Sequence, residues 1–188
     1  MDTILFALWF FLPAGVANAS PVIAKRLPYL SKLDAPLDFC AVYRGHRVFG
    51  PHKTWRGLIA GICAASLVVY GQQLIFQHHE VGLLALGAAW QGTDYLRHPA
   101  ILTGFLFGFG ALMGDAIESF IKRQRGIGAG EVWFPYDQLD YIIGGCLAIS
   151  LLARLEPAQY AAIFSVWFLL HLLFSYIGYR LRLKSKPI

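Results

Sequence analysis

Charged residues are scarce in this sequence. Asp, Glu, Lys and Arg together make up 14% of its 188 residues, whereas soluble globular domains carry about 25%. Hydrophobic residues make up 57%, and they gather in runs long enough for helices that cross a bilayer. This composition argues against a soluble protein, and the length of the runs argues against a β-barrel. The sequence predicts an all-α integral membrane bundle, a single domain over residues 1–188.

Cysteine and histidine motifs are also sparse. The three cysteines, Cys40, Cys63 and Cys146, are scattered, with no CxxC pair and no histidine at zinc spacing. We interpret them as small apolar residues or unreactive thiols. None of the six histidines belongs to an HExxH pattern, and we expect His171, inside an apolar run, to be structural. The sequence therefore gives no indication of a zinc site.

The N-terminus has no Lys or Arg ahead of its first apolar run. A secretory signal peptide carries positive charge at this position, but Asp2 is the only charged residue before residues 4–22. Ala17, Asn18 and Ala19 resemble a cleavage site only in isolation. We therefore expect a retained first helix.

Five apolar runs are predicted to span the membrane, and a sixth is too short. The sixth, residues 81–90, would rise only about 15 Å as a helix, half the thickness of a bilayer core. We expect it to be interfacial or re-entrant. The five predicted spans are residues 4–22, 57–76, 100–121, 141–155 and 160–179, of which the fourth is short and has room to begin earlier.

The distribution of Lys and Arg supports five spans. With five, the loop over about residues 24–56 has seven of these residues, the loop over about 122–139 has three, and the tail has four, which places 14 of the 16 on one side. Six spans would divide them equally. The positive-inside tendency predicts the N-terminus outside and the C-terminus and both loops in the cytoplasm. The net charge of +5 then reflects topology, and we expect no nucleic-acid partner.

Acidic and basic residues crowd into one stretch, residues 114–145. Charges this dense between apolar flanks are costly unless they line a site that faces water. If the third helix continues into this stretch, helical spacing places its charged side chains on one face. The acidic members are Asp115, Glu118, Glu131, Asp137 and Asp140, and the basic ones are Lys122, Arg123 and Arg125.

These residue types suit the transfer of a phosphoryl or nucleotidyl group. Asp115, Asp137 and Asp140, from two helix ends, can hold one or two Mg²⁺ ions through hard oxygen ligands. Positive charge for phosphates would come from Lys and Arg side chains. Such reactions depend on positioning and charge neutralisation more than on a protein nucleophile, and none is evident. The predicted phosphate-binding residues are Lys53, Arg56, Lys122 and Arg123.

Each part of this pattern also has a simpler interpretation. A basic cluster such as Lys122 and Arg123 most often marks the end of a membrane helix. Asp137 and Asp140 alone would suit the N-terminal cap of a helix. A small proton- or cation-coupled transporter is the alternative from another class, with acidic residues along an ion path, but carboxylates beside Lys and Arg at helix ends favour an enzyme. No inverted repeat supports a transporter.

Three motifs taken together resemble the CDP-archaeol synthase family. They are KTWRG at residues 53–57, GDAIESFIKRQRG at 114–126 and DQLD at 137–140. Asn18 with Pro21, PLD at 36–38, and Gly45 with Gly50 fit the same family, and phosphatidate cytidylyltransferases are similar at a greater distance.

The resemblance implies a five-helix membrane enzyme that uses CTP and Mg²⁺. It would convert a lipid phosphate monoester, the di-O-geranylgeranylglycerol phosphate of archaea, to a CDP-lipid and pyrophosphate at the cytoplasmic face. Phosphatidate is the alternative lipid, and residues 77–99 look like an insertion. The resemblance implies metal ligands at Asp115, Asp137 and Asp140, phosphate ligands at Lys53, Arg56, Lys122 and Arg123, with Lys122 catalytic, and further contacts at Asn18, Asp38, Thr54 and Ser119.

Overall fold

The computed structural model describes residues 2–78 and 94–180, and almost all of its regular structure is helical. The only strands in those residues form a two-stranded antiparallel hairpin. The elements are α1 (Asp2–Ala24), η1 (Pro28–Leu33), β1 (Val42–Tyr43), β2 (His46–Arg47), α2 (Trp55–His78), η3 (Asp94–Arg97), α4 (Ala100–Gln124), α5 (Tyr136–Ile149) and α6 (Pro157–Arg180).

The predicted all-α membrane bundle is confirmed. Among the described residues four helices, α1, α2, α4 and α6, are long and apolar enough to cross a bilayer. The helix predicted over residues 141–155 instead runs over 136–149 as α5. Its 14 residues rise about 21 Å, less than the bilayer core of about 30 Å. The five-span topology and its orientation remain predictions, and residues 81–90 lie outside the described part of the chain.

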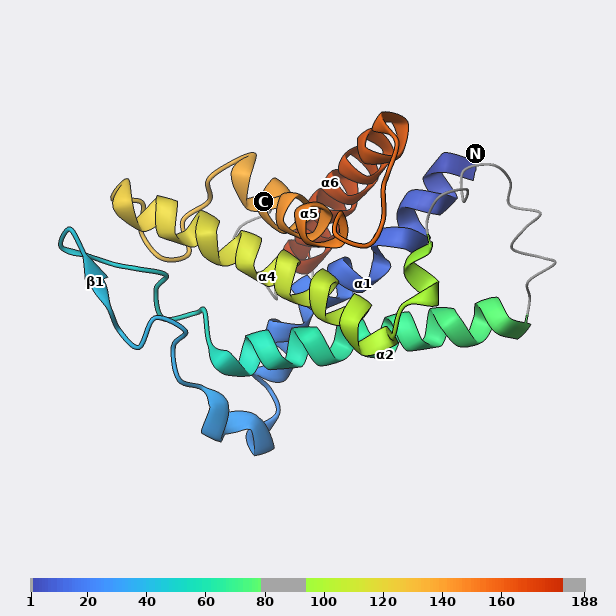
Figure 1. The fold of residues 1–188 in the computed structure, drawn as a ribbon. Helices are drawn as coiled ribbons and strands as arrows, with labels where there is room; N and C mark the ends of the chain where they lie inside the picture. The colour runs from blue at the N-terminus through green and yellow to red at the C-terminus, as the bar shows by residue number, and fades with distance from the viewer. Residues whose placement is uncertain (1, 79–93, 181–188) are drawn as a thin grey trace.

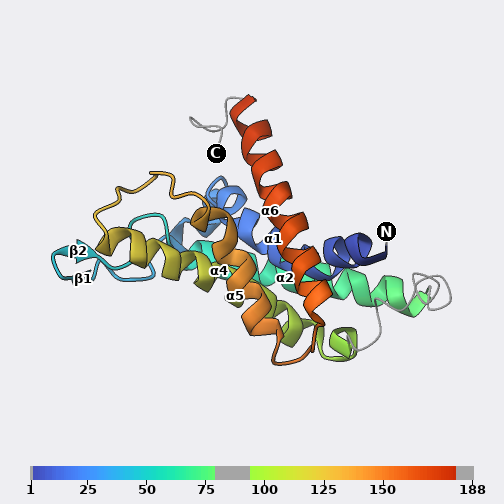
Figure 2. The same cartoon turned by 90° about the horizontal axis from the view of Figure 1, so that it is seen from above.

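Helix α4 is the centre of the bundle because its glycines let two neighbours approach closely. Figure 1 shows α4 running beside α2, and Figure 2 shows α5 lying against α4. A Cβ on Gly104 would overlap the backbone of Ser66 in α2. A Cβ on Gly114 would overlap the carbonyl oxygen of Asp140 in α5, and one on Gly144 would overlap the carbonyl oxygen of Gly110. Such close backbone contact needs small residues.

Aromatic side chains of α1 form the core of the bundle. Phe10 and Phe11 are fully buried and meet Phe107 of α4 edge to face, with ring centroids 5.4 and 6.1 Å apart. Trp167 of α6 donates its indole N–H to the carbonyl of Ala7 at 2.8 Å. Edge-to-face pairs add to the energy of burial, and these contacts attach both α4 and α6 to α1.

Asp38 organises the loop between η1 and α2. Burial opposes ionisation of its carboxyl group, but hydrogen bonds from the backbone of Phe49 and from Arg47, Gly50 and Cys40 outweigh this effect and lower the pKa of Asp38 to about 2. Arg47 lies 2.6 Å from the carboxylate. An antiparallel bridge between Pro36 and Thr54 closes the base of this loop.

Candidate active site

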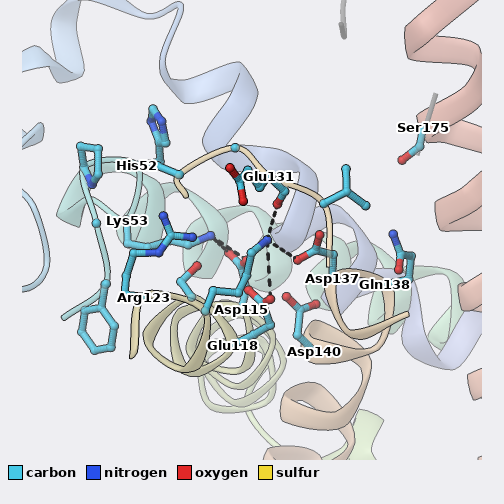
Figure 3. Close-up of a pocket in the computed structure, with 18 of the residues that line it drawn as sticks. His52, Lys53, Asp115, Glu118, Arg123, Glu131, Asp137, Gln138, Asp140 and Ser175 are labelled. Atoms are coloured by element: carbon cyan, nitrogen blue, oxygen red, sulfur yellow. Dashed lines mark hydrogen bonds and ion pairs between the residues drawn. The ribbon is translucent and has the colours of Figure 1, made fainter. Parts of the chain in front are cut away.

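A polar cavity of about 950 Å³ lies where α4 ends and α5 begins. The loop that leads into α2, the loop between α4 and α5, and one face of α6 complete its wall (Figure 3). The lining residues are Lys25, Phe49, Gly50, Pro51, His52, Lys53, Asp115, Glu118, Ser119, Lys122, Arg123, Ala129, Gly130, Glu131, Val132, Asp137, Gln138, Asp140, His171 and Ser175.

Three carboxylates in this cavity are close enough to bind one metal ion. Asp115, Glu118 and Asp140 each offer an oxygen, and these oxygens lie within 4.8 Å of one another. The close contact between Gly114 and the backbone of Asp140 holds the two helices at this spacing. Carboxylates so close repel one another unless a cation or proton neutralises them.

Glu118 gives the strongest sign that a cation belongs here. Its side chain is only 8% exposed, and its Oε1 has no hydrogen-bond partner in the described part of the chain. Lys122 Nζ forms a long ion pair with that oxygen, at 3.7 Å. A buried carboxylate oxygen without a hydrogen bond is costly, and hard oxygen ligands are those that Mg²⁺ prefers. The donor set therefore fits Mg²⁺.

Lys53 connects the loop before α2 to the acidic cluster. Its ammonium group lies 2.6 Å from both carboxylate oxygens of Asp115, although the two residues are 62 positions apart. The structure thus brings together two residues that the motifs placed in one site. A charged pair of this kind gives Lys53 a fixed position at the cavity wall.

Lys122 is held by a different set of groups. Its Nζ donates to Asp137 Oδ1 at 2.7 Å and to the carbonyl oxygen of Glu131 at 2.6 Å. The other oxygen of Asp137 accepts a hydrogen bond from the backbone N–H of Trp133 at 2.7 Å. Asp137, predicted as a metal ligand, thus contacts Lys122, whereas Glu118 lies with Asp115 and Asp140 in the described carboxylate cluster. The metal-ligand role of Asp137 stays a prediction.

The remaining predicted residues divide into two groups. Ser119 and Arg123 line the cavity as expected, whereas four others lie outside its described lining. Thr54 Oγ1 accepts a hydrogen bond from the backbone N–H of Gly57 at the start of α2. The carboxylate of Asp38 accepts hydrogen bonds from Arg47 and from the backbone N–H of Phe49 in its own loop. Arg56 is buried against Asp34 at 2.9 Å. Asn18, in α1, is the fourth predicted residue that lies outside the described cavity lining.

Several lining residues were not predicted. His171 and Ser175 line the cavity from α6, and His171 also packs on the ring of Tyr141 with centroids 5.7 Å apart. Their spacing of four residues places them on one face of an apolar helix, a signal that the sequence offered. Gln138, between the two aspartates of the DQLD motif, also lines the cavity.

Comparison with known proteins places the chain in one family. It matches the CarS-like family, described as CDP-archaeol synthase, over residues 1–188. It is 31% identical to the CDP-archaeol synthase of Pyrococcus furiosus over 188 residues, covering 100% of this chain and 99% of that protein. It is 33% identical to the CDP-archaeol synthase of Methanopyrus kandleri over 183 residues, covering 96% of this chain and 91% of that protein.

A solved structure gives the same result. The protein in that solved structure, described as an intramembrane enzyme for archaeal membrane lipids biosynthesis, superposes on this chain with a TM-score of 0.68 at 31% sequence identity. The match covers 91% of this chain and 93% of that one. The fold and the family assignment therefore agree.

Proposed function

Because the chain belongs to the CarS-like CDP-archaeol synthase family, whose members are membrane CTP-dependent lipid cytidylyltransferases, we propose that it transfers CMP from CTP to an archaeal diether glycerol phosphate. An oxygen of the lipid phosphate forms a bond to the α-phosphorus of CTP. The bond from that phosphorus to the bridging oxygen of the β-phosphate breaks, and pyrophosphate leaves with the electron pair. The products are a CDP-lipid and pyrophosphate.

A single observation carries the proposal: three carboxylates and two lysines from three separate segments converge on one cavity. Asp115 and Glu118 come from α4, Asp140 from α5 and Lys53 from the loop before α2, and Lys122 lies beside them. A transporter path would not need lysines fixed at the acidic cluster. Phosphoryl chemistry does need both charges, because metal-bound oxygens and Lys or Arg share the neutralisation of phosphates.

Mg²⁺ would be held by Asp115, Glu118 and Asp140, which supply the clustered oxygens. When bound, such an ion polarises phosphoryl oxygens and neutralises developing charge. The chain's own cations bind and orient the rest of the triphosphate. Lys53, Lys122 and Arg123 line the cavity, and Arg123 Nε has no hydrogen-bond partner in the described residues. No protein base is required, because the attacking phosphate oxygen is already an anion.

The lipid would reach the cavity from the membrane, with the cavity on the cytoplasmic side. The end of α6 next to the cavity carries exposed apolar side chains, among them Phe174 and Ile177, which suit contact with hydrocarbon. The placement of Lys and Arg supports the cytoplasmic orientation. CTP is available on that side.

The test is direct assay of the product. Purified protein in detergent is incubated with labelled CTP, Mg²⁺ and matched ether- and ester-linked glycerol phosphates that share chain length. A labelled CDP-lipid with stoichiometric pyrophosphate is expected, with the ether lipid preferred. If the enzyme uses phosphatidate as well as or better than the ether lipid, phosphatidate takes the place of the ether lipid as the proposed acceptor. Absence of both CDP-lipid and pyrophosphate with every lipid would refute it.

A further inference from the structure

Gln138 lines the cavity with a buried amide whose carbonyl oxygen has no hydrogen-bond partner in the described part of the chain. The residue is 2% exposed and lies in the first turn of α5 on the cavity wall. Its Oε1 has no hydrogen bond to any group in residues 2–78 or 94–180. A buried polar group left in this state costs about 1–3 kcal/mol, so native proteins normally satisfy it with protein, water or ligand.

The other unpaired buried atoms of the cavity wall already have a use in the proposed reaction. Glu118 Oε1 and Arg123 Nε lack partners in the described chain, and a metal ion and a phosphate would satisfy them. Gln138 has no such use, because a neutral amide contributes little to binding Mg²⁺ or a triphosphate that is already surrounded by Lys and Arg. Its ligand must be a different part of the substrates.

The position of Gln138 indicates which part. In Figure 3 the basic side chains of His52, Lys53 and Arg123 lie on one side of the acidic cluster, and Gln138 and Ser175 lie on the other. The attacking and leaving oxygens of a phosphoryl transfer lie roughly in line on opposite faces of the phosphorus. If pyrophosphate leaves toward the basic side, the acceptor phosphate attacks from the side of Gln138.

We propose that Gln138 binds the phosphate of the acceptor lipid: its unpaired Oε1 accepts from the protonated oxygen of a phosphate monoanion, and its amide N–H donates to an unprotonated oxygen of the same phosphate. This inference rests on the proposed function. A neutral side chain suits this place, since it holds the nucleophile without lowering its negative charge through ion pairing. Ser175, from α6, shares this side of the cavity.

The experiment measures steady-state kinetics in mixed micelles, with the lipid phosphate varied as a mole fraction and CTP varied separately. The test variant is Gln138→Met, which keeps the length of the side chain and removes both hydrogen-bonding groups. The control is Gln72→Met. Gln72 is equally buried, at 2% exposure, and its Oε1 likewise has no hydrogen-bond partner in the described chain. Its amide N–H donates to the carbonyl of Trp9, and the residue lies outside the described cavity lining. Gln138→Glu is a second test variant, in which a negative charge repels the phosphate.

We expect Gln138→Met to raise the KM for the lipid phosphate about 10-fold or more, the effect of losing a hydrogen bond to a charged group. The KM for CTP should change less than twofold, and Gln138→Glu should raise the KM for the lipid further. Gln72→Met should leave both KM values unchanged. A rise in the KM for CTP with an unchanged KM for the lipid would overturn the inference. Failure of the wild-type protein to form any CDP-lipid would instead refute the proposed function itself. Binding of CTP to each variant shows that it is folded.

Discussion

The contact between Gly114 and Asp140 determines the spacing of the proposed metal ligands, and Gly114→Ala tests it. A Cβ at this position would overlap the carbonyl oxygen of Asp140 and come within 3.1 Å of the Cα of Gly144. Both neighbours are backbone, so neither can rotate away, and α4 must separate from α5. Overpacking of this kind costs about 1–3 kcal/mol. The gain in helix propensity from Gly to Ala, about 1 kcal/mol, offsets only part of it.

The effect on catalysis should exceed the effect on stability. Asp115 lies next to Gly114 in the chain, so separating the helices also moves Asp115 away from Asp140. A displacement of about 1 Å in a catalytic group can cost about 100-fold in rate. We therefore expect Gly114→Ala to lower kcat/KM for CTP about 100-fold, while the midpoint of thermal unfolding in detergent falls by several degrees.

Gly71→Ala is the matched control. Gly71 also lies inside a long helix, α2, but a Cβ there would meet nothing within 4 Å in the described part of the chain. This variant should keep the wild-type kcat/KM and an equal or higher unfolding midpoint, because only helix propensity changes. If Gly114→Ala matches Gly71→Ala in both measurements, the close contact does not position the site.

Three further predictions follow from individual side chains. Glu118→Gln should raise the Mg²⁺ concentration for half-maximal rate about 10-fold or more, since it removes a charged ligand. Asp137→Asn should leave that Mg²⁺ concentration unchanged and lower kcat about 10- to 100-fold, because Lys122 loses its carboxylate partner. If instead the Mg²⁺ requirement rises for Asp137→Asn and not for Glu118→Gln, then Asp137 is the metal ligand. The pKa of Asp38 is lowered to about 2, so its ionised form stabilises the fold by about 2 kcal/mol above pH 4. This contribution is lost as the pH falls from about 4 to 2. In denaturant unfolding, Asp38→Asn should therefore have a lower free energy of unfolding than the wild type at pH 7, and the difference should disappear near pH 2. A difference that does not depend on pH would contradict this role.

The helices were predictable because each apolar run is bounded by charged or turn-forming residues. The exception is α5, which begins at Tyr136, ahead of the predicted apolar run. Its first turns carry Asp137, Gln138 and Asp140, and polar residues that face a cavity do not register as part of a membrane helix. Hydropathy therefore placed the start of this helix too late.

The site was predictable at the level of motifs and less so at the level of roles. Spacing put Asp115 and Glu118 on one face of a helix, but it could not show whether Glu118 or Asp137 joins the acidic cluster. That choice depends on the loop after α4, which brings the carbonyl of Glu131 to Lys122 and so draws Asp137 to the lysine. Arg56 was expected at the phosphates from its motif, but it lies in the first turn of α2 and forms an ion pair with Asp34.

Cytidylyl transfer in this cavity can be tested by measuring the rate of CDP-lipid formation by Asp140→Asn. Asparagine keeps the size of the side chain and removes the charge that would hold the metal. We expect this variant to lose more than 99% of the wild-type rate while it elutes from size-exclusion chromatography in detergent as the wild type does. A correctly inserted Asp140→Asn protein that forms CDP-lipid at the wild-type rate would contradict it.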